Sequence, residues 1–333
     1  MNLNKLKKTF IIAEIGNNHE GSFNVACKLI KAAKKAGVDA VKFQTFKTED
    51  FINLHEKKRF SKLKKFELTQ EEFYKLSLLA KKNNLEFIST PFDLGSANFL
   101  NKIVDCFKIA SGDNNYYELI KTVLKFNKPT FISTGFMNFN EILNLHAFIK
   151  KKRFDNSKIA FLHCVSSYPV DDNEANLLSI KFLKKKIPYT VGYSDHTLGI
   201  QASIAAFVLG AQIIEKHFTL DNNYSKFRDH KISLNQSDMK ALVLSIRSVE
   251  KMMGKEKKFI QLNEKKNLFN SRRSIYARED INVGQKINNY NVKFLRPYKM
   301  LNPNDIYKIQ NKLVKTKIKK DQAISVKDLY FKR

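Results

Sequence analysis

The stretch YTVGYSDHTLGIQASIAAFVLGAQIIEKHFT, residues 189–219, decides the fold of this chain. Its pattern predicts a strand, a polar turn, an apolar helix and a second strand, which form a βαβ unit. One histidine, His196 or His217, follows the apolar run of each strand. Neighbouring parallel strands end at the same edge of a sheet, so both imidazoles are expected there. Two neutral imidazoles at one edge could bind a divalent metal, although ordinary core or surface histidines fit the same spacing.

Short apolar runs alternate with helix-length periodic segments through the first 250 residues. Thr69 followed by Glu72 predicts the start of one helix, because this pair forms a capping box. Eight strand–helix pairs predict an α/β fold, a (β/α)₈ TIM barrel, with a doubly wound open sheet as the alternative. The expected strands are residues 10–14, 40–44, 86–90, 106–109, 130–133, 159–163, 189–193 and 212–217.

Polar residues stand at the ends of these strands. In a barrel all the carboxyl ends meet at one face, where active sites are built. Each residue alone could be a helix cap or a loop residue, but the whole set predicts a site. The set comprises Glu14, Lys42, Gln44, Thr90, Lys108, Ser111, Ser133, Ser166, Tyr168, Ser194, His196 and His217.

The composition favours a cytoplasmic protein. The net charge is +28, but the lysines are spread along the chain without a nucleic-acid motif, so we expect a solvated surface that attracts anions and no nucleic-acid partner. Three cysteines without metal spacing suit a reducing compartment. No apolar run could span a bilayer, and the short N-terminal run contains Glu14, so we expect neither a membrane partner nor a signal peptide.

The C-terminal part differs from the rest. Residues 281–287 recur weakly as residues 318–324, which predicts a small β-rich domain with internal symmetry or a strand-rich tail packed on the barrel. Gly284 and Asp321 stand at equivalent positions of the two repeats, where a tight turn can require a positive φ angle. We expect a barrel at residues 1–254, a charged linker at 255–271 and the small domain at 272–333.

Ten motifs together give the chain a specific resemblance over nearly its whole length. It resembles the sialic acid synthase family, whose C-terminal antifreeze-like (SAF, β-clip) domain follows a barrel. The motifs are AEIGNNHEG at 13–21, KFQTF at 42–46, STPFD at 89–93, KIASGD at 108–113, STG at 133–135, HCVSSYP at 163–169, GYSDHT at 192–197, EKHFT at 215–219, DHK at 229–231 and RRS at 272–274.

The resemblance implies a transferase that condenses phosphoenolpyruvate with an N-acylated amino-hexose, with carbon–oxygen cleavage, to give a nonulosonic acid and phosphate. It implies a divalent metal at His196 and His217, Mn²⁺ with Mg²⁺ and Co²⁺ as alternatives, and Glu14 for acid–base work or as a structural hydrogen-bond acceptor. It implies a homodimer that exchanges its C-terminal domains. The implied phosphoenolpyruvate residues are Lys42, Thr90, Lys108, Ser111, Ser133, Ser166 and Ser194. The implied sugar residues are Gln44, Asp113, Tyr168, Asp229 and Arg296.

Three departures from the family pattern leave the sugar open. Asp113 replaces a usual glutamate, Ser166 stands where some members have asparagine, and the loop at residues 225–229 is one residue longer than usual. Alternatives are a related synthase that uses a phosphorylated sugar, a non-catalytic carbohydrate- or ice-binding protein, and a nucleic-acid binder. The two histidines expected to bind the metal, and the polar residues at the strand ends, argue against a non-catalytic binding protein.

Overall fold

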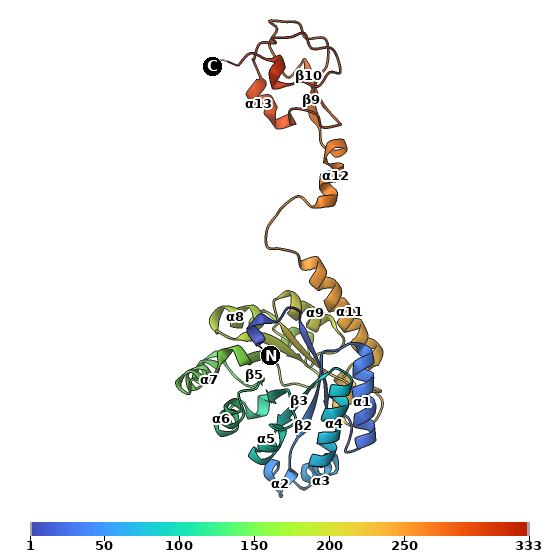
Figure 1. Cartoon of the computed structure of the whole chain (residues 1–333), viewed down its shortest axis with the longest axis vertical. Coiled ribbons are helices and arrows are strands. Elements are labelled where there is room, and N and C mark those ends of the chain that lie inside the picture. Colours follow the sequence, from blue (N-terminus) through green and yellow to red (C-terminus); the bar gives the residue numbers. More distant parts are fainter. Residues whose placement is uncertain (1, 332–333) are drawn as a thin grey trace. The chain divides into compact units, whose positions relative to one another are not determined.

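The computed structural model describes residues 2–331, which fall in two compact units, Met1–Gly254 and Lys255–Arg333. The first unit is a closed barrel of eight parallel strands in sequence order, with helices around its outside (Figure 1). The barrel closes where β8 pairs with β1, from Phe10 opposite Ile213 to Glu14 opposite His217. This closure confirms the TIM barrel and excludes the open sheet. The strands are β1 Phe10–Gly16, β2 Ala40–Thr45, β3 Glu86–Pro91, β4 Cys106–Ile109, β5 Thr130–Ser133, β6 Ile159–Cys164, β7 Thr190–Asp195 and β8 Ile213–His217.

Helices begin and end where the local chemistry dictates. Thr69 and Glu72 form the predicted capping box of α4, and Gly37 ends α1 with a φ of 86°. The helices of this unit are α1 Phe23–Ala36, α2 Thr48–Phe51, α3 Lys57–Phe66, α4 Gln70–Lys82, α5 Leu94–Leu100, α6 Tyr117–Lys125, α7 Phe139–Lys151, α8 Leu178–Lys186, α9 Gln201–Val208, α10 Arg228–Ile232 and α11 Gln236–Met253.

The connection between β2 and α4 contains helices that the sequence pattern did not predict. Helix α3 has Phe60, Leu63 and Phe66 at spacings of three, a sparse apolar stripe on a highly basic segment. Its Phe66 is buried against Phe227, with ring centroids 5.2 Å apart. A tertiary contact therefore supplies the apolar partner that the weak periodicity did not reveal.

The barrel interior has an apolar end and a charged end. Side chains two apart on a strand face the same side. The amino-terminal half of the interior is a packed apolar cluster, which Leu3 of the short helix η1 (Leu3–Lys5) joins. The cluster consists of Leu3, Phe10, Ile12, Ala40, Ile88, Cys106, Phe131, Ala160, Leu162 and Ile213. Two positions further along β1, β2, β4 and β8, charged residues replace these apolar ones.

The second unit has its own small core. It contains α12 Leu262–Ser271, β9 Ser274–Ala277, β10 Val292–Leu295 and α13 Ile306–Ile309, with β9 and β10 antiparallel. The two sequence repeats face each other through a bridge between Ile281 and Ile318. Gly284 and Asp321 have φ values of 84° and 64°, as their turn positions predicted. Helix α12 occupies the second half of the segment predicted as a linker.

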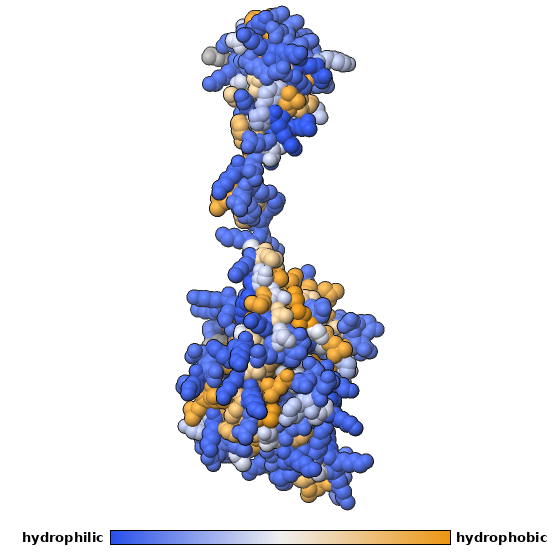
Figure 2. Space-filling model, turned by 90° about the vertical axis from the view of Figure 1, so that its right-hand side faces the viewer, coloured by the Kyte–Doolittle hydropathy of each residue, from blue (hydrophilic) through white to orange (hydrophobic). Residues whose placement is uncertain are grey.

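Hydrophilic side chains cover most of each unit in the view of Figure 2, in keeping with the solvated, lysine-rich surface expected from the composition. Among residues 2–331, no helix is both long and apolar enough to span a membrane.

Candidate active site

Four buried charges fill the carboxyl end of the barrel. Lys42 Nζ lies 2.9 Å from Glu14 Oε2 and 3.6 Å from Glu215 Oε1, and Lys108 Nζ lies 2.9 Å from Glu215 Oε1. All four side chains are at most 4% exposed. Two cations and two anions balance, which offsets the high cost of burying each charge. We call Glu14, Lys42, Lys108 and Glu215 the charge quartet.

The two carboxyl groups of the quartet differ in their affinity for protons. Burial raises the pKa of Glu14 and outweighs the opposing effect of Lys42. Burial would also raise the pKa of Glu215, but Lys108 and Lys42 outweigh it and lower that pKa to about 2. Glu215 therefore stays ionised as the partner of both lysines, whereas Glu14 is the carboxyl group that can hold a proton. This difference suits Glu14 for acid–base work.

Hydroxyl groups surround the lysines. Thr90 accepts a hydrogen bond from Lys42 at 3.3 Å, and Ser194 donates one to Glu215 at 2.9 Å. The hydroxyl groups of Ser133 and Ser166 are buried without any hydrogen-bond partner. Buried polar groups normally have partners, so these two donors are free for a ligand. Ammonium and hydroxyl donors together are what a phosphate or a carboxylate needs.

Gly135 makes room for two of these hydroxyl groups. A Cβ atom at this position would lie 2.3 Å from Ser166 Oγ and 2.6 Å from Ser111 Oγ. Asn114 Nδ2 donates to the carbonyl oxygens of Ser133 and Gly135, at 3.1 and 2.8 Å, and so holds this turn. Because Gly135 has no side chain, the turn after β5 can approach the hydroxyl groups of Ser111 and Ser166 closely.

The histidines meet as predicted at the ends of β7 and β8. The ring centroids of His196 and His217 are 5.3 Å apart. His196 Nδ1 lies 2.9 Å from the carbonyl oxygen of Val165, so this nitrogen donates and leaves Nε2 free as a ligand. Burial lowers the pKa of His217 well below its usual range, and its Nδ1 is buried without a partner.

The pair fits a divalent metal held by two imidazoles. Each ring has a free nitrogen, and Asp229 Oδ2 lies 4.0 Å from His217 Nδ1. Among the described residues, no group of three or more histidine, cysteine, aspartate or glutamate side chains is arranged as a metal site. A metal at this pair would therefore keep several positions for water or substrate.

A cavity of about 760 Å³ lies at the barrel mouth, where His217 forms part of its wall. Six of the predicted residues line it, namely Gln44, Ser111, Ser166, Tyr168, His217 and Asp229. Gln44 Nε2 donates to Glu14 Oε1 at 3.2 Å and so connects the cavity wall to the quartet. The ring of Tyr168 packs against that of His196 in a tilted arrangement with centroids 4.2 Å apart, and the guanidinium carbon of Arg228 lies 4.4 Å from the Tyr168 ring centroid.

Asp113, one of the predicted sugar residues, does not line this cavity. Asp113 lies in the turn after β4, where burial raises its pKa to about 6 and leaves its Oδ2 without a partner. Arg296 follows β10 in the second unit and has an exposed side chain. Their roles toward a sugar stay predictions.

Sequence reasoning missed several residues that organise the site. Glu215 precedes His217 by two positions on β8, so strand alternation could have placed it inside the barrel. Asp195 and Lys216 form an ion pair of 3.1 Å with both side chains fully buried, next to each histidine in sequence. Asp195 also accepts hydrogen bonds from the backbone and the hydroxyl of Thr197, both at 2.8 Å, which holds the turn around His196.

Comparisons with known proteins agree with this architecture. Residues 29–258 match the NeuB family, and residues 272–329 match the SAF domain. The N,N'-diacetyllegionaminic acid synthase of Campylobacter jejuni is 39% identical, over 96% of this chain and 99% of that protein. An uncharacterised protein of Methanocaldococcus jannaschii is 41% identical, over 98% of this chain and 96% of its own. A crystal structure of N-acetylneuraminic acid (sialic acid) synthetase from Leptospira borgpetersenii, in complex with citrate, aligns with a TM-score of 0.73 at 35% identity, covering 78% of this chain and 90% of that one.

Proposed function

Because the chain belongs to the NeuB family and carries a SAF domain, we propose that it condenses phosphoenolpyruvate with an N-acylated amino-hexose. The products would be a nonulosonic acid and inorganic phosphate. The names of relatives support this class: legionaminic acid synthase, pseudaminic acid synthase and, in mouse at 31% identity, N-acetylneuraminate-9-phosphate synthase. The observation that carries the proposal is that the carboxyl end of one barrel holds two buried lysines and two buried hydroxyl groups without partners, Ser133 and Ser166.

The residues suggest how phosphoenolpyruvate is held. Lys42 and Lys108 would bind its phosphate and carboxylate groups, and Ser133 and Ser166 would donate to the remaining oxygens. Burial excludes bulk water, which strengthens each of these contacts. The barrel strands fix the two lysines, and the sugar would enter from the mouth cavity above them.

Carbon 3 of phosphoenolpyruvate would attack the aldehyde carbon of the open-chain sugar, forming the new carbon–carbon bond. The aldehyde oxygen gains a proton, and we assign this transfer to Glu14, a buried carboxyl group whose pKa is raised. The attack leaves a cationic centre at carbon 2, to which water adds and loses one proton. The bond between carbon 2 and the phosphate oxygen then breaks, phosphate takes the electron pair, and the carbon 2 hydroxyl loses its proton to become a carbonyl group. Gln44, Tyr168 and Asp229 would orient the sugar from the cavity wall.

We propose that His196 and His217 hold a divalent ion, with Mn²⁺ preferred over Mg²⁺ and Co²⁺. When bound, such an ion supplies Lewis acidity at the aldehyde oxygen. His217 presents an unprotonated nitrogen for this purpose because burial disfavours its charged form. Tyr168 keeps the two imidazoles in place through its ring contacts, at 4.2 Å from His196 and 6.0 Å from His217.

A phosphate-release assay tests the reaction. The purified protein would receive phosphoenolpyruvate, Mn²⁺ and one sugar from a panel of N-acetylmannosamine, its 6-phosphate and diacetamido-trideoxy-hexoses. We expect sugar-dependent phosphate release with one of them and a nine-carbon acid as the product. Absence of release with every sugar, from protein shown to be folded, would refute the proposal.

We further propose that Arg296 serves the barrel of a partner subunit in a homodimer with exchanged C-terminal domains. Mixing Arg296→Ala and His217→Ala chains, each inactive alone, tests this. Half of the dimers in an equal mixture are heterodimers with one intact site, so activity should return to about a quarter of the wild-type value. Verified heterodimers without activity would show that Arg296 does not act across subunits.

A further inference from the structure

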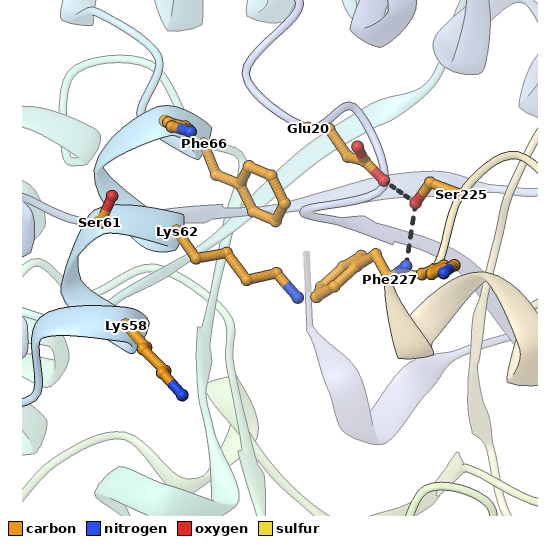
Figure 3. A pocket seen from close by; sticks show the side chains of 9 residues that line it. Glu20, Lys58, Ser61, Lys62, Phe66, Ser225 and Phe227 are labelled. Atoms are coloured by element: carbon orange, nitrogen blue, oxygen red, sulfur yellow. Dashed lines mark hydrogen bonds between the residues drawn. The ribbon is translucent and has the colours of Figure 1, made fainter.

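A second, smaller cavity lies beside the barrel mouth, between α3 and the segment that precedes α10. Its volume is about 430 Å³. Lys58, Lys62 and Lys65 line it from α3, and Lys226 lines it from the other side. Figure 3 shows Lys58, Lys62 and Phe66 on the helix, opposite Glu20, Ser225 and Phe227. We call this cavity the lysine pocket.

The lysine pocket shares part of its wall with the mouth cavity. Lys62, Lys226 and Phe227 line both spaces. Residues 225–227, which precede α10, form the wall of the pocket that faces α3. The pocket therefore opens next to the cavity where we propose that the substrate enters.

The charge in this pocket is not neutralised by the protein. Lys58, Lys62 and Lys65 lie three or four residues apart on one face of α3, where like charges repel. None of these three, nor Lys226, takes part in an ion pair with a described carboxylate. By contrast, Lys64 on the same helix pairs with Glu49 at 2.8 Å and Glu67 at 2.9 Å.

The one acidic residue of the pocket already has partners. Glu20 Oε1 accepts a hydrogen bond from Ser225 Oγ and lies 3.1 Å from His230 Nε2. Across the pocket, aromatic contacts hold Lys62: its Nζ lies 4.5 Å from the Phe227 ring centroid and 5.8 Å from that of Phe66. Such cation–π contacts keep an ammonium group in a defined position. The pocket thus combines four lysines with a single acid.

We propose that the lysine pocket binds a phosphoryl group. A tetrahedral dianion accepts hydrogen bonds from several ammonium groups at once, and it removes the repulsion among these lysines. The group could arrive on the sugar, at the end far from the aldehyde, or as free phosphate, which is also a product of the reaction. The first source rests on the proposed function, whereas the second does not.

Calorimetry tests the pocket without turnover. Inorganic phosphate is titrated into full-length protein saturated with phosphoenolpyruvate, in the absence of sugar. Phosphate should bind, and Lys58→Gln/Lys65→Gln should weaken it at least about tenfold, because two charge-assisted contacts are lost. The matched control, Lys57→Gln/Lys64→Gln, removes two charges from the same helix outside the pocket and should leave binding unchanged.

Steady-state kinetics separates the two sources. If the group arrives on the sugar, the wild type should prefer N-acetylmannosamine 6-phosphate over N-acetylmannosamine in kcat/KM at least about tenfold. Lys58→Gln/Lys65→Gln should abolish that preference and leave kcat/KM for the unphosphorylated sugar unchanged. If the group arrives as free phosphate, the sugars should show no such preference, while phosphate binding still depends on these lysines.

The proposal fails if the two lysine substitutions alter neither phosphate binding nor the preference between sugars, or if the control pair alters them equally. Phosphoenolpyruvate binding is measured first in its own titration. Its absence would count against the proposed function, and phosphate titration of the ligand-free protein would still test the pocket.

Discussion

The two halves of the barrel interior use the same strands for opposite purposes. On β1, Ile12 lies in the apolar cluster and Glu14 in the charge quartet, and on β8 the same step separates Ile213 from Glu215. The apolar half gains stability from excluded water. The charged half forgoes that gain and holds lysines and carboxyl groups in fixed positions. A step of two residues along a strand thus separates the half that stabilises the barrel from the half that can do chemistry.

The largest effect expected in the charged half concerns the histidines. His217→Ala should lower condensation activity by on the order of 10³-fold, because several kcal/mol of charge stabilisation are lost. The thermal midpoint should move by only a few degrees, since the residue stands at a strand end. Chelation of the wild type should reproduce the loss, and added Mn²⁺ should reverse it. Full activity in the presence of chelator would remove the metal from the proposal.

The next effect concerns the lysines of the quartet. Lys42→Ala and Lys108→Ala should each weaken phosphoenolpyruvate binding by on the order of 10–100-fold, because a charge-assisted hydrogen bond is lost. Calorimetry measures the dissociation constants, and circular dichroism shows that each variant is folded. An unchanged dissociation constant in both variants would mean that the ligand binds elsewhere.

The apolar half should behave in the opposite way. Ile12→Ala should lower the free energy of unfolding by about 2–4 kcal/mol, because it leaves a cavity in a fully buried cluster. The folded fraction should bind phosphoenolpyruvate with wild-type affinity. Chemical denaturation and calorimetry measure the two quantities separately. A large change in affinity would show that the two halves are coupled.

The smallest effect expected is a gain in stability with a defined pH dependence. Burial raises the pKa of Asp113 from 3.8 to about 6. Between these values the folded state keeps a proton that the unfolded state has released, so wild-type stability falls as the pH rises through this window. Asp113→Asn removes this loss and should raise the free energy of unfolding by about 1–2 kcal/mol above pH 7.

Denaturation curves of both proteins at several pH values provide the measurement. The advantage of Asp113→Asn should shrink as the pH falls toward 4. If the advantage is equally large at pH 4 and pH 8, it does not come from the carboxyl group's ionisation.

The sequence predicted the barrel because each strand is a short apolar run that ends in a polar residue. It predicted the meeting of His196 and His217 for the same reason, since parallel strands share an edge. It did not predict α3, because that helix depends on contacts such as Phe66 with Phe227. It also missed Glu215, whose importance comes from two lysines that are distant in sequence. Pairings across strands require the register, which local patterns do not contain.

The carboxyl groups of the quartet occupy the lysines before any ligand arrives. Glu14 and Glu215 contact the ammonium groups that an anionic ligand would contact, so their carboxylates take the place of the ligand's negative groups. An incoming anion must therefore compete with the protein's own carboxylates, and part of its affinity is spent on displacing them. These carboxylates also hold both ammonium groups in fixed positions and away from water, so the donors are already in place when an anionic ligand displaces the carboxylates.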